Sequence, residues 1–381
     1  MRIGIPAEAL AGETRVALAP SAIPALIKKK HEVIVESDAG LASGFADADY
    51  EKAGAVVVKT RQEVYNAAGI VFKVQAPAVD PTTGVCEAEM LVEGTALIGF
   101  LAPLANVEMV RVLARRKITS FSMEFIPRIT RAQSMDALSS MATLAGYKAV
   151  LIAAKHLPRI FPYLITAAGS IPPATVLVLG AGVAGLQAIA TAKRLGARVE
   201  AFDPRPVVKE QVESLGAVFV AMETVEDAQT AGGYAKEQSE EFLKREQETI
   251  AARLPKCDVV VTTAQVFGKK APLLITADMV KLMPRGSIIV DLAAEQGGNC
   301  ELTKANQMIE EGGVTVYGAV NLPATLPVNA SQMYSKNVST LFDHLYKDPE
   351  KGLDFEDEIT RSSCLTHAGE IRNDLARQAA G

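Results

Sequence analysis

Short apolar runs alternate with longer stretches of mixed polarity along most of the chain. Runs of this length suit strands that are buried on both faces, and the stretches between them have the apolar spacing of helices. Because strand and helix alternate, the pattern predicts an α/β domain with a doubly wound parallel sheet in the first third of the chain. Its predicted strands are Arg2–Pro6, Glu32–Glu36, Ala55–Val58, Ile70–Gln75, Thr95–Phe100 and Ile118–Met123.

The same alternation returns in the second half of the chain. Between the two halves, Met135–His156 has a helical pattern that is apolar on nearly all faces, which is typical of a buried helix. We therefore predict two doubly wound, parallel-sheet α/β domains joined by long helices. The predicted strands of the second domain are Val176–Leu179, Arg198–Phe202, Ala217–Ala221, Asp258–Thr263, Ser287–Asp291 and Val314–Tyr317.

The domain boundaries follow from these elements. Residues 1–134 are expected to form the N-terminal α/β domain, and residues 135–325 the second domain. Another helix is predicted at Ser331–Tyr346, and the tail Lys347–Gly381 is expected to pack against the first domain. The segment 326–381 would therefore complete the N-terminal domain.

Composition and charge narrow the class of protein. The 381 residues are 49% hydrophobic and 22% charged, as in globular proteins, and the net charge of −5 offers no basic surface for nucleic acid or an anionic membrane. The uncharged run Thr166–Ala192 is long enough for a membrane span, but the prolines and glycines inside it argue against one. A soluble protein of a reducing compartment is expected, because no signal peptide precedes the first strand and the cysteines lack zinc-binding spacing.

The strongest motif lies in Thr175–Asp203. Gly180, Gly182 and Gly185 follow a predicted strand at G-x-G-x-x-G spacing and open a predicted helix. These glycines would allow a tight turn, the approach of a pyrophosphate and close helix–strand packing, while the helix N-terminus attracts phosphates. Asp203 ends the next strand, where a carboxylate accepts a bond from a ribose 2′-hydroxyl and repels a 2′-phosphate. The motif predicts a Rossmann-like domain that binds NAD in preference to NADP.

A polar cluster precedes the long helix and contains Arg128, Gln133, Asp136 and Ser139. One interpretation is a helix start with ordinary capping and a solvated Arg–Asp ion pair. The other is a set of hydrogen-bond donors and acceptors placed where two domains meet over a nicotinamide. The residues alone favour neither.

A long polar segment, Met222–Glu240, has Gly233 and Tyr234 in its middle. Segments of this length without periodicity are either lids or disordered insertions. A tyrosine beside paired glycines suits a flap that closes over a ligand. Both interpretations stay open, and the loops that follow Thr263 and Asp291 are expected at the ligand-binding edge of the sheet.

The chain offers no obvious general base. Its four histidines, His31, His156, His344 and His367, lie in none of the segments with a predicted site. Oxidation of an alcohol or amine releases a proton and usually needs a positioned base, whereas transfer between two nicotinamides moves only a hydride. The sequence therefore favours an unusual redox partner over an ordinary dehydrogenase substrate.

Several segments together resemble one protein family. PRITRAQSMD with LSSMATLAGYKAV, GAGVAGLQAIATAKRLGA, AGGYAKE and VDLAAEQGGNC are similar to the NAD(H)-binding component of proton-translocating nicotinamide nucleotide transhydrogenase. That family shares its fold with alanine dehydrogenase. The resemblance implies a homodimer whose NADH gives a hydride to NADP⁺ on a separate subunit. It also implies coupling to proton translocation through a membrane-spanning subunit, with the chain peripheral on the cytoplasmic face of the plasma membrane.

The resemblance also implies roles for particular residues. Arg128, Gln133, Asp136 and Ser139 would be catalytic, in the sense of holding the nicotinamide toward the partner nucleotide. No metal ligand is implied. The residues implied to bind NAD are Arg128, Ile129, Gln133, Ser139, Gly180, Gly182, Val183, Ala184, Gly185, Asp203, Pro204, Arg205, Gly233, Tyr234, Ala264 and Gln265.

Two other functions stay open. Arg15 and Lys73 stand where alanine dehydrogenase has its carboxylate-binding and catalytic basic residues, and Glu295 stands where it has an aspartate. Its catalytic histidine would fall at or near Ala102, where this chain has none, which argues against amino-acid oxidation. The second alternative is a non-catalytic NAD-binding regulator, for which an intact glycine motif would be sufficient.

Overall fold

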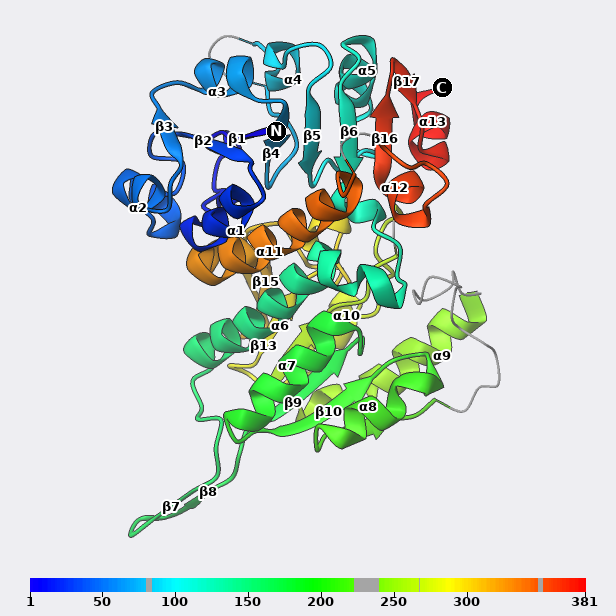
Figure 1. Cartoon of the computed structure of the whole chain (residues 1–381). Helices are drawn as coiled ribbons and strands as arrows, with labels where there is room; N and C mark the ends of the chain where they lie inside the picture. The colour runs from blue at the N-terminus through cyan, green and yellow to red at the C-terminus, as the bar shows by residue number, and fades with distance from the viewer. Residues whose placement is uncertain (80–83, 223–239, 267, 349–351) are drawn as a thin grey trace. The chain divides into compact units, whose positions relative to one another are not determined.

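The chain divides into two compact units. A computed structural model describes residues 1–79, 84–222, 240–266, 268–348 and 352–381 (Figure 1). Unit 1 comprises Met1–Met141 with Ala324–Gly381, and unit 2 comprises Ala142–Pro323. The sequence placed the first boundary before the long helix, whereas the division falls inside that helix, after Met141. Unit 2 is therefore one continuous insertion in unit 1.

Unit 1 is built on an eight-stranded sheet. Its strand order is β17-β16-β6-β5-β4-β1-β2-β3, and β1 to β6 are parallel. The C-terminal segment extends the sheet, because β16 pairs antiparallel with β6. The strands are β1 (Arg2–Ile5), β2 (Glu32–Glu36), β3 (Val56–Val58), β4 (Ile70–Phe72), β5 (Ala96–Gly99), β6 (Thr119–Ser122), β16 (Cys364–His367) and β17 (Glu370–Ile371).

Helices cover both faces of this sheet. On β4, the buried Val71 packs in a cluster with α5, while the ring of its neighbour Phe72 meets Phe342 of α11 at 5.5 Å between centroids. Alternate residues of one short strand thus face two helical layers, as expected for a doubly wound domain. The helices are α1 (Ile23–Lys28), α2 (Asp47–Lys52), α3 (Arg61–Ala67), α4 (Glu87–Met90), α5 (Val107–Arg115), α11 (Pro327–Leu345), α12 (Glu358–Ser363) and α13 (Asp374–Ala380).

Unit 2 has a seven-stranded sheet in the order β11-β10-β9-β12-β13-β15-β14. All neighbours are parallel except β14 and β15. The sequence analysis missed β14 because its residues, MIEE, are mostly exposed and lack an apolar run. The strands are β9 (Thr175–Leu179), β10 (Arg198–Phe202), β11 (Val218–Val220), β12 (Val259–Thr262), β13 (Ile288–Asp291), β14 (Met308–Glu311) and β15 (Val314–Gly318).

Two apolar clusters lie on opposite faces of this second sheet. One joins Val176 and Val178 of β9 to α6 (Ala137–His156), α7 (Val183–Arg194) and α8 (Lys209–Ser214). The other joins Leu177 and Leu179 to α9 (Glu240–Ala251) and α10 (Ala277–Val280). The prediction of two Rossmann-like, doubly wound domains is therefore confirmed.

The helix α6 is the one helix of the described ranges that is long and apolar enough to cross a membrane by length and composition. Its second half instead packs in the core of unit 2, where Ala149, Val150 and Ala153 are fully buried. The uncharged run Thr166–Ala192 is divided among β8, β9 and α7. Neither segment has the environment of a membrane span.

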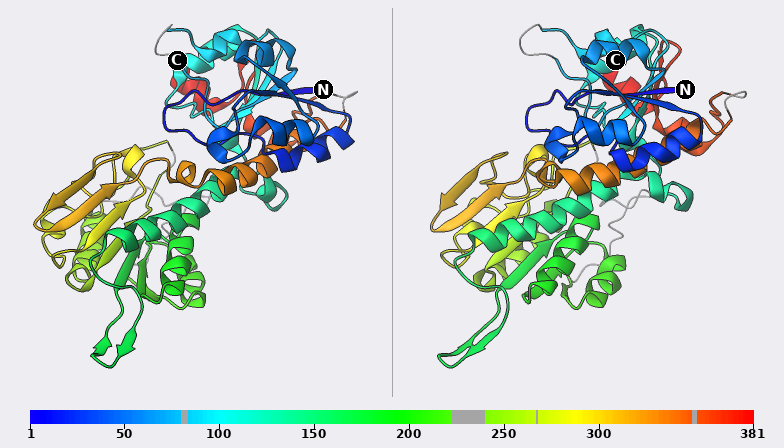
Figure 2. Two further views of the ribbon diagram at one scale, coloured as in Figure 1. Left: turned by 90° about the vertical axis from the view of Figure 1, so that its left-hand side faces the viewer. Right: turned by 60° about the vertical axis from the view of Figure 1, so that its left-hand side comes forward.

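A two-stranded hairpin, β7 (Leu164–Thr166) and β8 (Gly169–Ile171), projects from unit 2 (Figure 2). The sequence analysis missed it because both strands are only three residues long. All six strand residues are exposed, and Ile165 keeps 74% of its surface accessible. Side chains of this kind on an isolated hairpin are unusual, since a hairpin alone is marginally stable.

Candidate nucleotide-binding site

The order of strands in unit 2 reverses between β9 and β12. From β9 the chain proceeds outward to β10 and β11, and then returns to the other side of β9 for β12 and β13. The two strands pair from Val176↔Val259 to Leu179↔Thr262, so their carboxyl ends lie next to each other. Doubly wound sheets bind ligands in the crevice at such a reversal. Gly180, directly after β9, stands at this position.

The three glycines of the motif have different surroundings. Gly180 has φ +96°, in the left-handed region that favours glycine. A Cβ added to Gly185 would lie 1.8 Å from the carbonyl oxygen of Gly180, so the first turn of α7 packs directly on the strand end. A Cβ on Gly182 would meet nothing within 4 Å. The backbone is thus crowded where helix meets strand and open where a phosphate would approach, which fits a dinucleotide.

The helix α7 begins at Val183, with Gly182 as its N-cap residue and Leu186 N–H bonded to the Gly182 carbonyl at 2.8 Å. The first N–H groups of a helix have no acceptor within it, and the helix dipole favours an anion there. Val183 is 40% exposed and Ala184 follows it in the same turn. The N-terminus of α7 is therefore a suitable site for a pyrophosphate.

Asp203 follows β10 and is only 5% exposed. One carboxylate oxygen accepts bonds from Ala181 N–H at 2.7 Å and from Arg205 Nη2 at 2.8 Å, and the other accepts from the N–H and Nε of Arg205 at 2.9 and 2.8 Å. These bonds raise the pKa of Arg205 above its usual value. The sequence predicted Asp203 as an acceptor at the adenosine ribose, and the structure shows it as half of a buried ion pair, with Pro204 between the partners.

A buried network holds the loop after β12. Asn299, fully buried, donates to the carbonyl of Ala264 at 2.8 Å and accepts from its N–H at 3.0 Å. Asp291 in turn accepts bonds from Asn299 N–H and the Thr303 hydroxyl, both at 2.7 Å. Gln265 donates to a carbonyl of the neighbouring loop at 2.9 Å. The sequence analysis overlooked Asn299, since a single asparagine after two glycines gives no periodic signal.

The predicted lid residues Gly233 and Tyr234 lie outside the described residues. The described chain resumes with α9, where Phe242, Glu246 and Ile250 are all buried. Ile250 packs in the apolar cluster that also contains Phe202. Glu246 is thus a carboxylate on the buried face of a helix beside the end of β10, and the sequence analysis did not single it out.

The polar cluster before α6 belongs to unit 1. It begins with a short 3₁₀ helix, Thr130–Met135, and Arg128 and Gln133 flank the half-buried Ile129 and are exposed. The carboxylate oxygens of Asp136 accept bonds from Ser139, one from its N–H at 2.9 Å and one from its hydroxyl at 2.6 Å. The Arg128–Asp136 ion pair that the sequence suggested is therefore replaced by a cap on α6, because Ser139 lies one helical turn away.

The strand order of unit 1 also reverses, between β1 and β4. Lys73 directly follows β4, and its ammonium lies 3.2 Å from a carboxylate oxygen of Glu8 and 3.3 Å from one of Glu87. The side chain of Lys73 is 1% exposed and those of both glutamates 3%. Burial raises the pKa of Glu8 above its usual value, against the attraction of Lys73. A compact charged group therefore fills this position.

A second buried pair lies in the same unit. Arg15 donates to both oxygens of Glu13, at 2.7 and 2.5 Å, and Gln75 donates to Glu13 at 2.8 Å. Burial opposes the ionisation of Glu13, but these bonds outweigh it and lower its pKa to about 2. The two basic residues that the sequence related to alanine dehydrogenase, Arg15 and Lys73, are thus both bonded to internal carboxylates.

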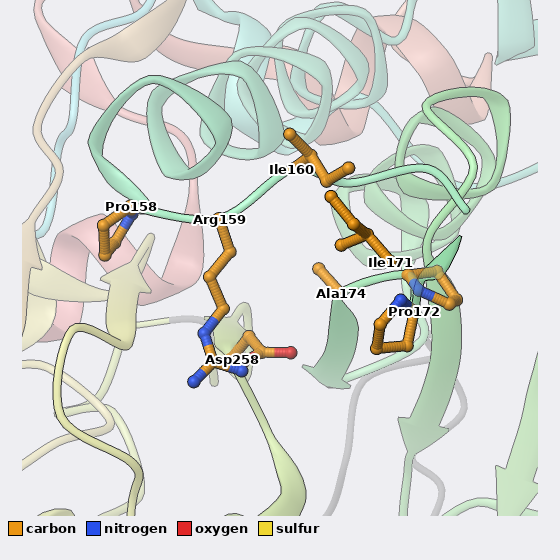
Figure 3. Close-up of a pocket in the computed structure, with 8 residues that line it drawn as sticks. Pro158, Arg159, Ile160, Ile171, Pro172, Ala174 and Asp258 are labelled. Carbon is orange, nitrogen blue, oxygen red and sulfur yellow. Dashed lines mark ion pairs between the residues drawn. The ribbon is translucent and has the colours of Figure 1, made fainter. Parts of the chain in front are cut away.

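A pocket of about 390 Å³ lies in unit 2 near the root of the hairpin (Figure 3). It is lined mainly by apolar side chains, with an ion pair between Arg159 and Asp258 at 3.2 Å. Ala174 and Asp258 directly precede β9 and β12, so the pocket lies at the amino ends of these strands. The glycine turn lies at their carboxyl ends, and the pocket is therefore separate from the predicted nucleotide site.

Comparison with known proteins covers nearly the whole chain. Residues 4–145 match the family described as Alanine dehydrogenase/PNT, N-terminal domain, and residues 149–374 match Alanine dehydrogenase/PNT, C-terminal domain. The chain is 46% identical over 375 residues to an NAD(P) transhydrogenase subunit alpha protein of Rhodospirillum rubrum, with 97% of each covered. It is 31% identical over 337 residues to alanine dehydrogenase of Staphylococcus epidermidis, covering 86% of this chain and 82% of that protein.

Solved structures agree with these matches. A transhydrogenase structure from Sinorhizobium meliloti superposes with a TM-score of 0.87 at 40% identity, covering 97% of this chain and all of that one. An L-alanine dehydrogenase superposes with a TM-score of 0.81 at 26% identity, covering 100% and 99%. The resemblance found from the sequence is confirmed: the chain belongs to the alanine dehydrogenase/PNT family and is similar over nearly its whole length to the alpha subunit of NAD(P) transhydrogenase.

Proposed function

We propose that this chain is the NAD(H)-binding component of a proton-translocating NAD(P) transhydrogenase. In this function NADH bound to the chain gives a hydride to NADP⁺ held by a partner subunit. The observation that carries the proposal is the glycine turn of unit 2, crowded at Gly185 and open at Gly182, at the reversal of the strand order. The full-length similarity to relatives named as transhydrogenase subunits supports the reaction class.

The residues of unit 2 divide the nucleotide between them in this proposal. The turn from Gly180 to Gly185, with Val183 and Ala184, holds the pyrophosphate at the N-terminus of α7. Asp203, Pro204 and Arg205 hold the adenosine ribose. Ala264 and Gln265 border the site after β12, and Gly233 and Tyr234 cover it. NADH is expected to bind well and NADPH poorly, and a fluorescence titration that gave equal affinities would contradict this assignment.

The residues of unit 1 orient the reacting ring. Arg128, Gln133 and Ser139 hold the carboxamide, and Asp136 fixes the Ser139 hydroxyl at 2.6 Å. Bound NADH supplies the hydride, so the protein has to align two rings and exclude water without moving a proton. The histidines suit this division of labour, because His31, His344 and His367 contact Phe342, Asp357 and Thr119 in structural positions of unit 1.

The test separates rate from affinity. Arg128→Ala and Gln133→Asn should leave NADH affinity within about tenfold, a loss of at most ~1.4 kcal/mol, because most binding comes from the glycine turn. The rate of hydride transfer to a partner-bound NADP analogue, measured by stopped flow, should fall about a hundredfold or more. Arg111→Ala, which removes an exposed arginine of α5 in the same unit, is the control. A rate that falls only as far as affinity would refute the catalytic assignment.

Alanine dehydrogenase activity is the second candidate, supported by the buried basic residues Arg15 and Lys73 at the strand reversal of unit 1. Ala102 stands where that enzyme has its histidine, and both basic side chains are already bonded to glutamates. Purified protein given L-alanine and NAD⁺ should therefore reduce no detectable NAD⁺. Robust reduction would favour the dehydrogenase. A non-catalytic NAD-binding regulator would bind NADH but fail the transfer assay with any partner.

The proposal includes an assembly. The chain would form a homodimer and dock, through NADP-binding and membrane-spanning subunits, on the cytoplasmic face of the plasma membrane. The exposed apolar hairpin, with Ile165 at its most accessible position, supports a protein contact there. Sedimentation should give a dimer, and binding to membranes should require the partner subunits. A monomer at micromolar concentration, or binding to bare lipid vesicles, would contradict the assembly.

A further inference from the structure

The helix α9 carries a charged group on its buried face. Phe242, Glu246 and Ile250 are four residues apart and form one stripe, with exposures of 5%, 4% and 1%. Ile250 lies in the apolar cluster that contains Phe202 and Val220, so this stripe faces the ends of β10 and β11. The side chain of Glu246 therefore points toward the strand that ends at Asp203, rather than into solvent.

Glu246 is buried without compensation. Throughout the described ranges it has no hydrogen-bond or ion-pair partner, although buried carboxylates normally have one. Burial raises its pKa to about 7, and the negative charge of Asp203 adds to the shift. The two carboxylates are thus close enough to repel each other. An unpartnered buried carboxylate costs stability, which suggests that it is kept for a ligand.

Asp203 alone is a weak barrier to a phosphate in this structure. Both of its oxygens are bonded to Arg205, so the pair carries no net charge. A guanidinium at this place would attract a 2′-phosphate, since arginine is a preferred phosphate ligand. A second negative charge is needed if the site is to select the 2′-hydroxyl by electrostatics.

We propose that Glu246 is a specificity-determining residue at the adenosine end of the nucleotide site, where its unbalanced charge excludes nucleotides with a 2′-phosphate. The assignment rests on the proposed function, in that it takes unit 2 to bind NAD(H) at the glycine turn. Glu246 contributes selectivity against NADPH, while the affinity for NADH comes from the turn and from Asp203.

The first experiment is a fluorescence titration of the full-length chain with NADH and NADPH at pH 8.5. Glu246→Gln should tighten NADPH binding at least tenfold and change NADH affinity less than threefold. The matched control is Glu248→Gln, an exposed glutamate on the same helix, which should change neither affinity. Glu246→Met, which keeps the length of the side chain without a polar group, should act like Glu246→Gln. Thermal unfolding checks that each variant is folded.

A pH series adds an independent measurement. Asp203 is the ionisable residue of the described chain whose charge acts on Glu246; Arg205 is paired with Asp203, and burial keeps Cys257 neutral with a pKa of about 12. Between pH 7.5 and 9 the 2′-phosphate is already a dianion. Over this range the Kd of the unmodified protein for NADPH should rise about tenfold per pH unit as Glu246 ionises. The Kd of Glu246→Gln should be nearly constant.

The outcomes separate the two levels of the argument. If the unmodified protein binds neither nucleotide, the proposed function fails. If it binds NADH well but Glu246→Gln leaves NADPH binding unchanged, or tightens both nucleotides equally, the role of Glu246 is overturned while the NAD(H) site stands. A pH dependence that persists in Glu246→Gln would also overturn it, because another group would then be responsible.

Discussion

The two units share one topology but fill the same position of the sheet in opposite ways. In unit 2 the strand order reverses beside Gly180, and the backbone there is open at Gly182. In unit 1 it reverses beside Lys73, whose ammonium is enclosed by Glu8 and Glu87. A doubly wound sheet creates a ligand crevice at this point, but the residues that follow the strands decide whether it stays open.

The difference explains how one fold is used twice in a single chain. Unit 2 uses glycines and helix N–H groups, which recognise a phosphate without side chains. Unit 1 uses buried charges that satisfy one another, and such a network is stable only while all its members are present. The following four predictions test this contrast.

The largest effect is expected from Gly185→Ala. The new Cβ would lie 1.8 Å from the Gly180 carbonyl oxygen, so α7 would have to move away from β9. We expect unit 2 to lose at least about 4 kcal/mol of stability and all measurable NADH binding. Urea unfolding and NADH titration measure the two effects. Gly182→Ala is the control: it should unfold within about 0.5 kcal/mol of the original protein. Equal stability of the two variants would refute the distinction between a crowded and an open glycine.

The next effect concerns unit 1. Glu13→Gln leaves the guanidinium of Arg15 buried without its carboxylate, which should cost about 3–4 kcal/mol in the free energy of unfolding. The double variant Glu13→Gln with Arg15→Gln should recover part of this loss, because no isolated charge is left. NADH affinity should change less than threefold in both. Glu108→Gln, at an exposed ion pair, is the control and should cost less than about 1 kcal/mol.

The third prediction is the pH dependence of the same pair. The folded-state pKa of Glu13 is lowered from 4.5 to about 2, so its contribution is present above pH 4.5 and is lost as pH falls toward 2. The stability difference between the unmodified protein and Glu13→Gln should shrink by about 3 kcal/mol over that range. Glu8, whose raised pKa acts in the opposite direction, is present in both proteins and cancels. A difference that stays constant with pH would show that Glu13 is not held ionised by Arg15.

The smallest effect is expected at Ala102, shortly after β5. Its φ is +41°, a region that costs an alanine about 1 kcal/mol, and its N–H donates to Glu124 at 2.7 Å. Unit 2 has a glycine in the corresponding region at Gly180, whereas unit 1 has a side chain. Ala102→Gly should therefore stabilise unit 1 by about 0.5 kcal/mol after the entropy of the unfolded chain is counted. Ala105→Gly, in the same loop without positive φ, should destabilise it instead, and thermal unfolding distinguishes the two.

The sequence was sufficient where an element is marked by its own residues. The strands Glu32–Glu36 and Arg198–Phe202 were predicted with their observed bounds, because apolar runs end there at polar or glycine residues. The strand Ile70–Gln75 was predicted too long: regular pairing stops at Phe72, and Lys73 to Gln75 enter the charged cluster of unit 1.

Features that depend on distant partners could not be predicted. The exposed β14 is a strand only because β15 lies beside it, and the ion pair of Asp203 depends on how Arg205 folds back. The buried position of Glu246 follows from the packing of α9 against Phe202, which the charged sequence of that helix conceals. Tertiary contacts of this kind override local pattern and composition.

The discontinuous construction of unit 1 has a consequence for synthesis. On the ribosome, β6 has one edge without a neighbour until β16 emerges, and all of unit 2 is made in between (Figure 1). An open strand edge is prone to pairing with other chains, whereas unit 2 is contiguous and can close as soon as Pro323 is free. Unit 2 is therefore expected to fold first. Limited proteolysis of chains stalled shortly after residue 340 would show a resistant unit 2 beside a cleavable N-terminal segment, and the reverse pattern would refute this order.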